Sequence, residues 1–226
     1  VGTVLLLVVL MASTIFNVQQ TIDDSTDMVF EGIRSESIGD AERSLTLLGG
    51  SINDFLSSID VGIQTLSGSD SLRNYDRDQT TWDLALESFE TLAKADDKIV
   101  TVYFSDIHNQ LIVYPNPDLP DDYDGRTRPW YKDAYANNGK VTWGSPYVDA
   151  NTGELVITAF QSVFNNSGEF IGVIAIDVDL ETFKQIIGQF AVSDDSKISI
   201  VDNDGLVMYS DNASRSIGQA INSEVT

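Results

Sequence analysis

The chain opens with an apolar run that carries no charge. Residues 1–18 (VGTVLLLVVLMASTIFNV) contain no ionisable side chain, and the first charged residue is Asp23. This length is close to the ~20 apolar residues that cross a bilayer as a helix. We therefore expect a transmembrane helix at residues 1–20, clipped at its start; a signal peptide would show a basic leading region and a small-residue cleavage site. Arg34 is the first basic residue, so the sequence after the helix is expected on the non-cytoplasmic side.

Helical spacing of apolar positions continues through the more polar sequence that follows. These positions advance by steps of three or four, which is typical of a buried helix face or of a coiled-coil seam. They are Ala41, Leu45, Leu48, Ile52, Phe55, Ile59, Ile63 and Leu66. We predict a stalk helix over residues 21–66, although Gly49 and Gly50 lower its helix propensity. Two interpretations stay open: the helix lies on its own domain, or it pairs with a second chain in a homodimer.

Beyond residue 66 the pattern changes from helical to strand periodicity. A loop at 67–78 and an amphipathic helix near 82–93 precede five strand-like segments. The five segments are residues 99–106, 110–116, 140–150, 154–164 and 169–179, and another short helix is expected through Ala136. Turns of the hairpin kind, NTG and NNSG, separate the last three segments. This order predicts an α+β domain with a five-stranded antiparallel sheet and helices on one side.

A second, shorter pattern follows the sheet. Residues 180–190 return to helical spacing, and from Lys197 the sequence KISIVDNDGLVMYS has the form of strand, turn and strand. The same form occurs at 102–116, which hints at two modules in tandem. We expect the second module to begin near residue 191 and to be cut short at Thr226.

Composition narrows the function classes. With 13 basic residues against 35 acidic ones, the net charge of −22 argues against binding to nucleic acid phosphates. The chain has no cysteine, which excludes disulfides, zinc–thiolate sites and thiol catalysis. His108 is the single histidine and falls in a predicted turn, so we interpret it as a surface residue. We expect no metal and no cofactor, because neither a metal-ligand cluster nor a glycine-rich phosphate loop is present.

The densest cluster of unusual chemistry is YDGRTRPWYKDAY, residues 123–135. Pro129 fixes the local backbone and so orients its neighbours. Arg128 offers a planar fork of donors that suits a carboxylate, while Trp130 adds an indole N–H and Tyr123 a hydroxyl. The alternative is that Trp130 and Tyr131 are core rings and that Arg128 is a surface charge.

Carboxylates elsewhere in the chain favour a pocket. Asp177 shares a strand face with Val173 and Ala175, and a carboxylate in so apolar a strand is costly to bury without a positive partner. Tyr147 and Asp149 lie two residues apart, so on a strand their side chains point the same way. One cation, two carboxylates and several aromatic rings would suit a zwitterion. The alternatives are a turn role for Asp149 and a strand-end cap or a salt bridge to Arg128 for Asp177.

The pattern Y-x4-R-P-W-Y, P-Y-V-D and a later D resembles the amino-acid-binding subgroup of the double-Cache family, the extracytoplasmic sensors of chemoreceptors and sensor kinases. The resemblance covers about residues 40–226 and implies a PAS-like fold. It implies a membrane-distal module at 67–190 with the ligand pocket, and the start of a membrane-proximal module at 191–226. It also implies two sets of binding residues: Tyr123, Arg128 and Trp130 for the ligand α-carboxylate, and Tyr131, Tyr147, Asp149 and Asp177 for its α-ammonium.

The function expected from this resemblance is that of a membrane-anchored receptor that binds free amino acids, or a related amine or small carboxylate, outside the cytoplasm. The expected output is that of a methyl-accepting chemotaxis protein, with a histidine kinase or a cyclase as alternatives. A Cache module that binds nothing and serves as a spacer or dimerisation element is the rival hypothesis. An enzyme that uses Asp149 and Asp177 as acid and base is a more distant one.

Overall fold

The computed structural model describes residues 24–75, 79–137, 139–149, 153, 155–181, 185–186, 189, 197–201, 205–210, 212, 216–217 and 219–220. The chain divides into two compact units, of which one is Phe55–Thr182 and the other combines Val1–Asp54 with Phe183–Thr226. None of the described helices is both long enough and apolar enough to cross a membrane. The transmembrane helix predicted at residues 1–20 lies outside the described residues, as does most of the helix predicted at 180–190.

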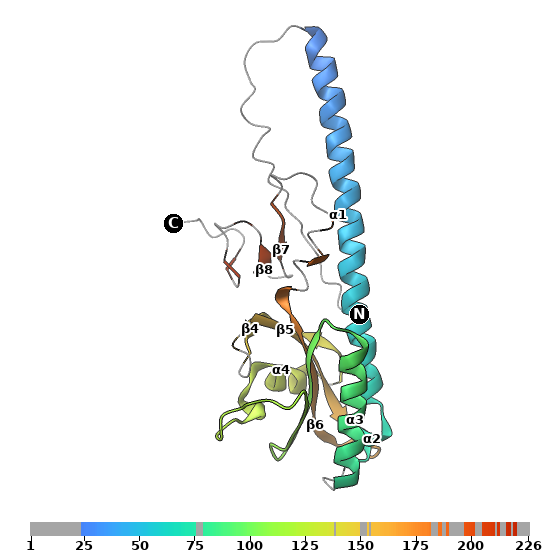
Figure 1. Ribbon diagram of the computed structural model, residues 1–226, viewed down its shortest axis with the longest axis vertical. Helices are drawn as coiled ribbons and strands as arrows, with labels where there is room; N and C mark the ends of the chain where they lie inside the picture. Colours follow the sequence, from blue (N-terminus) through green and yellow to red (C-terminus); the bar gives the residue numbers. More distant parts are fainter. Residues whose placement is uncertain are drawn as a thin grey trace. The chain divides into compact units, whose positions relative to one another are not determined.

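The long N-terminal helix is confirmed as α1 (Asp24–Ser67), which runs through Gly49 and Gly50 without a break. Its last turns belong to the unit Phe55–Thr182, and there the predicted apolar face is buried at Phe55, Ile59, Ile63 and Leu66. Two further helices, α2 (Asp70–Arg73) and α3 (Gln79–Ala95), follow α1 in the chain (Figure 1).

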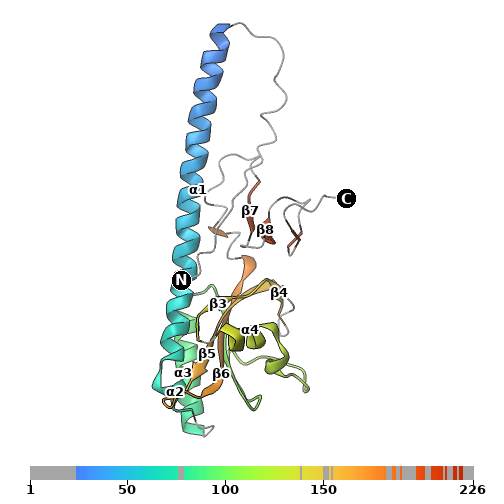
Figure 2. The same ribbon diagram turned by 180° about the vertical axis from the view of Figure 1, so that it is seen from behind.

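The five predicted strand segments form one antiparallel sheet (Figure 2). The strands are β1 (Ile99–Asp106), β2 (Leu111–Tyr114), β3 (Thr142–Trp143), β4 (Tyr147–Val148), β5 (Leu155–Phe164) and β6 (Phe170–Asp179). Their order is β2-β1-β6-β5-β3, and β4 also pairs with β5. The third predicted segment is therefore divided into β3 and β4 along the same edge. Pro146 lies between them, and proline has no N–H to donate to a ladder.

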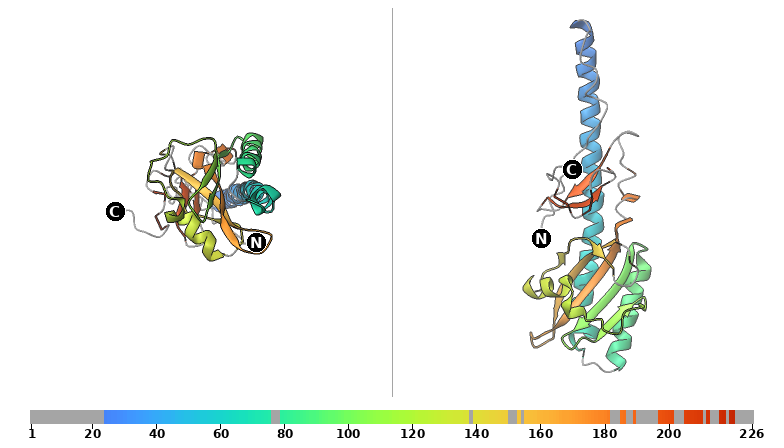
Figure 3. Two further views of the ribbon diagram at one scale, coloured as in Figure 1. Left: turned by 90° about the horizontal axis from the view of Figure 1, so that it is seen from below. Right: turned by 90° about the vertical axis from the view of Figure 1, so that its left-hand side faces the viewer.

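Helices cover both faces of this sheet, so the prediction of helices on one side is wrong. Where α1 meets the sheet, a Cβ atom on Gly62 would contact Leu92 of α3 and Ile176 of β6. The helix α4 (Pro129–Asn137) lies on the opposite face, with Trp130 and Ala134 packed against Tyr103, Val173 and Ala175. The left view of Figure 3 shows α4 on one side of the sheet and α3 on the other. Periodicity identified these helices but carried no information about the face that each one covers.

The described residues of the other unit include a small antiparallel hairpin. It consists of β7 (Ser199–Val201) and β8 (Val207–Ser210), with Ile200 opposite Tyr209. The predicted strand–turn–strand pattern is thus present, while its role as the start of a second module stays a prediction. The described residues contain one complete module, which is the six-stranded sheet with its helices.

Candidate ligand-binding site

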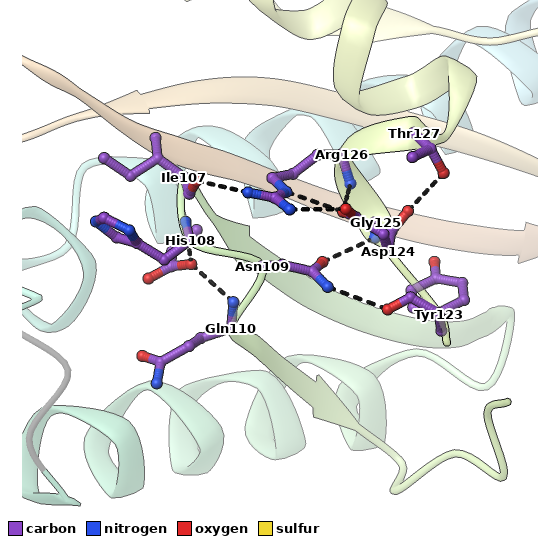
Figure 4. A network of polar contacts seen from close by, with 10 residues as sticks. Ile107, His108, Asn109, Gln110, Tyr123, Asp124, Gly125, Arg126 and Thr127 are labelled. Carbon is purple, nitrogen blue, oxygen red and sulfur yellow. Dashed lines mark hydrogen bonds and ion pairs between the residues drawn. The ribbon is translucent and has the colours of Figure 1, made fainter. Parts of the chain in front are cut away.

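A polar network fixes the segment between β2 and α4, which carries part of the candidate site (Figure 4). Asn109 lies in the β1–β2 turn with a φ of 66°, a conformation that asparagine tolerates better than most residues. Its Nδ2 donates to the carbonyl oxygen of Tyr123 at 3.1 Å, and its Oδ1 accepts from the backbone N–H of Gly125 at 3.0 Å. Asn109 therefore holds the backbone at Tyr123. His108 in the same turn is exposed.

Arg126 belongs to the same network and not to the pocket. Its guanidinium pairs with Asp124 at 2.7 Å, and its Nη1 donates to the carbonyl oxygen of Ile107 at 3.2 Å. The sequence between β2 and α4 thus contains two arginines with separate environments, because Arg126 is satisfied within the fold.

Arg128 sits where the 3-10 helix η1 (Gly125–Thr127) ends and α4 begins. Its backbone is extended, as the residue before a proline prefers, and Pro129 then starts α4. The guanidinium carbon lies 5.5 Å from the ring centre of Tyr147. Its Nε is buried and has no hydrogen-bond partner, and the side chain forms no ion pair with any residue that the structure describes. A buried arginine donor left without an acceptor is costly, so the geometry favours an anionic ligand here.

Asp177 is the buried acid of the site. In β6 it lies opposite Thr101 of β1 and Thr158 of β5, so the three side chains form one row across the sheet. Its Oδ1 accepts hydrogen bonds from Thr158 Oγ1 at 2.5 Å, from Tyr103 OH at 3.0 Å and from Tyr147 OH at 3.2 Å. Within the described part of the chain the carboxylate has hydroxyl partners and no cation. A salt bridge between Asp177 and Arg128 is thus not formed.

Burial dominates the electrostatics of Asp177. The side chain is 2% exposed, and loss of hydration raises the pKa of its carboxyl to about 7, while the hydrogen bond from Thr158 acts in the opposite direction. The charge of Asp149 contributes a further increase. Burial also raises the pKa of Tyr123, although Arg128 partly offsets that increase. A cation next to this carboxyl would stabilise its ionised form and lower its pKa.

Five of the seven predicted residues line one pocket: Tyr123, Arg128, Tyr147, Asp149 and Asp177. The other two predicted residues, Trp130 and Tyr131, are 3% and 8% exposed and belong to the core cluster behind it. The ring of Trp130 packs edge-on against that of Tyr103, with centres 5.0 Å apart. The structure therefore places these two rings as supports of the pocket wall, and their direct contact with a ligand stays a prediction.

Sequence reasoning missed several residues of the site. Thr101 and Tyr103 of β1 line the pocket with Leu111, Val113, Pro117 and Leu119, and Thr158 donates to Asp177 from the neighbouring strand β5. The strand register would have identified the two threonine hydroxyls, because Thr101 and Thr158 both lie opposite Asp177. The cavity has a volume of about 30 Å³, enough for two or three water molecules at about 10–15 Å³ each. The described residues contain no cluster of acids or histidine suited to a metal ion.

Comparison with known proteins agrees with this architecture. Residues 31–225 match the family model of the Cache domain. The chain is 35% identical over 120 residues to the methyl-accepting chemotaxis protein McpG of Pseudomonas putida, and 27% identical over 141 residues to TlpA of Bacillus subtilis. These matches cover 49% and 62% of this chain, but only 18% and 20% of the relatives. The chain thus spans about a fifth of the length of these relatives.

Solved structures of chemoreceptor domains share the fold. The ligand-binding domain of the Pseudomonas aeruginosa amino acid chemoreceptor PctC, in complex with GABA, superposes with a TM-score of 0.61 at 25% identity, over 72% of this chain and 71% of that one. The domain of PctB from the same organism, in complex with L-Gln, gives a TM-score of 0.67 at 22% identity, over 79% and 70%. The family match spans most of the sequence and the fold agrees with it: the chain belongs to the Cache domain family and is of the double-Cache sensor type.

Proposed function

We propose that the chain is the extracytoplasmic ligand-sensing domain of a transmembrane chemoreceptor, and that its ligands are free amino acids. One observation carries the proposal: the pocket brings together an arginine with an unsatisfied buried donor and a buried carboxylate that has no cationic partner among the described residues. Because Arg128 and Asp177 do not pair with each other, both can bind groups of a ligand. A zwitterion supplies a carboxylate for Arg128 and an ammonium for Asp177.

In this proposal the ligand α-carboxylate pairs with Arg128. Guanidinium and carboxylate match as a fork, and Tyr123 beside the arginine supplies a hydroxyl donor. The α-ammonium lies against Asp177 and Asp149. Binding of the ammonium lowers the pKa of Asp177, because an adjacent cation stabilises the ionised carboxylate. The hydroxyl of Tyr147 donates to Asp177, and its oxygen can accept a hydrogen bond from the ammonium.

The relatives support an assignment to amino acid sensing. The structural neighbours are named as amino acid chemoreceptors, and their complexes contain GABA, L-Gln and L-Arg. The sequence relatives are named methyl-accepting chemotaxis proteins. We extend both properties to this chain, together with anchoring at residues 1–20 and a homodimer formed through the stalk helix. Binding would then bias the arrangement of the stalk helices, and the membrane helices would transmit that bias.

A thermal unfolding series against the common amino acids tests the proposal. A ligand at about 100 times its dissociation constant adds about 2.7 kcal/mol to the free energy of unfolding, so at least one amino acid should raise the melting temperature. Arg128→Ala should abolish this increase, because it removes the partner of the carboxylate. Asp177→Ala should abolish it by removing the partner of the ammonium.

The chain offers a control in Arg43→Ala. Arg43 is an exposed arginine of α1 that pairs with Asp40 and does not line the pocket, so its loss should leave the ligand-induced increase in place. If no amino acid shifts the melting temperature, or if Arg128→Ala and Asp177→Ala both keep the shift, the proposed binding mode is wrong.

A further inference from the structure

One wall of the pocket is made of aliphatic side chains. Leu111 and Val113 project from β2 on the face that carries Tyr103, because Val113 lies opposite Tyr103 and Leu111 opposite Ser105. Pro117 and Leu119, in the segment after β2, line the same pocket. All four are partly buried. No charged group comes from this side among the residues that line the pocket.

The charged groups come from other elements. Asp177 belongs to β6, Asp149 follows β4, and Arg128 lies over the ring of Tyr147 in β4. In the sheet β1 separates β2 from β6. Neighbouring strands are about 4.8 Å apart, so β2 and β6 are roughly 10 Å apart. A ligand held by its α-carboxylate and α-ammonium therefore has its side chain free to extend toward the aliphatic wall.

We infer that the site selects amino acids with aliphatic side chains. The inference rests on the proposed function, since it assumes that the two charged groups of the ligand occupy Arg128 and the aspartates. A second charge on the ligand would lose its hydration against Leu111, Val113, Pro117 and Leu119 without gaining a partner.

Isothermal titration of a graded ligand series tests this selectivity. L-Alanine, L-2-aminobutyrate and L-norvaline differ by one methylene each, and burial of a methylene should tighten binding by about fourfold until the cavity is full. L-Aspartate and L-lysine should bind at least about 100-fold more weakly than L-2-aminobutyrate, because of the desolvated charge.

Leu119→Ala separates the aliphatic wall from the rest of the site. The substitution should weaken the binding of L-norvaline by about tenfold, because several buried methylene contacts are removed. The affinity for L-alanine should stay within about twofold. Leu84→Ala is the matched control, because Leu84 is 50% exposed on α3 and does not line the pocket. It should change neither ligand.

The outcomes distinguish this inference from the proposed function. If L-aspartate or L-lysine binds as tightly as the aliphatic series, or if Leu119→Ala leaves L-norvaline unchanged, the selectivity is wrong while amino acid sensing stands. If none of the five amino acids binds, the inferred selectivity is wrong. The proposed function is then also wrong, unless another amino acid raises the melting temperature.

Discussion

At the scale of single residues, Asp177 combines deep burial with three hydroxyl donors and a pKa raised to about 7. The proposed ligand ammonium needs the ionised carboxylate. Affinity should therefore rise with pH through about 7 and level off above it, falling about tenfold per pH unit on the acidic side. Isothermal titration across this range checks the profile. Asp179→Asn, two residues along β6, should leave the profile unchanged, and a flat profile in the unaltered protein would contradict the role of Asp177.

The unliganded protein should show the opposite dependence in its stability. The folded-state pKa of Asp177 lies above the value of 3.8 for a free aspartate, so between these two values the folded state binds more protons than the unfolded one. The stabilisation from this group is fully present below about pH 4, and it is lost as the pH rises through about 7. Asp177→Asn should remove this component of the pH dependence, which thermal unfolding at a series of pH values measures.

Asn109 provides a residue-scale test of how the pocket segment is positioned. Asn109→Gly keeps the left-handed backbone accessible but removes both side-chain hydrogen bonds, to Tyr123 and to Gly125. We expect a loss of about 1–3 kcal/mol in the free energy of unfolding and weaker ligand binding, because Tyr123 is less well held. Asn109→Asp keeps the acceptor for the N–H of Gly125 and should lower the free energy of unfolding by less than Asn109→Gly does. Equal stability of both variants and the unaltered protein would show that the network does not position the segment.

At the scale of elements, α1 carries glycines with different surroundings. A Cβ atom at Gly50 would have no neighbour within 4 Å. A Cβ atom at Gly62 would lie 3.2 Å from the side chain of Leu92. Gly50→Ala should thus stabilise the helix by about 0.5–1 kcal/mol through lower backbone entropy in the unfolded chain. Gly62→Ala should gain less or lose stability, because Leu92 must move. Chemical denaturation followed by circular dichroism measures both, and an equal gain at the two positions would contradict the packing of α1 on α3.

The elements were largely predictable from the sequence, since helices and strands differ in their apolar period. That period predicted α1, α3 and the five strand segments. It did not predict the division into β3 and β4 at Pro146, nor the placement of α4 on the face opposite α3. Both depend on pairing and packing between distant segments, and no local pattern records these.

The site was predictable where a residue type is costly to bury. Arg128 and Asp177 stood out because charges among apolar neighbours demand partners. Thr101, Tyr103 and Thr158 gave no such signal, because hydroxyl side chains are common in strands and only the register shows that they meet Asp177. The aliphatic wall at Leu111 and Val113 looked like ordinary core. Trp130 and Tyr131 pack as core rings, which matches the alternative that the sequence left open for them.

At the scale of the whole molecule, the central proposal is that the pocket recognises both charged groups of an amino acid together. Of the residues in the unit Phe55–Thr182, Arg128 and Asp177 represent the two poles. The same pocket contains a buried acid and an arginine whose Nε has no hydrogen-bond partner. In the proposed complex the ligand ammonium pairs with the acid and the ligand carboxylate pairs with the arginine.

The most direct measurement is isothermal titration with L-alanine and with its two halves, ethylamine and propionate. We expect L-alanine to bind and each half to bind at least about 100-fold more weakly, because a half leaves either Arg128 or Asp177 buried and unpaired. If either half binds as tightly as the intact amino acid, recognition of the zwitterion is contradicted.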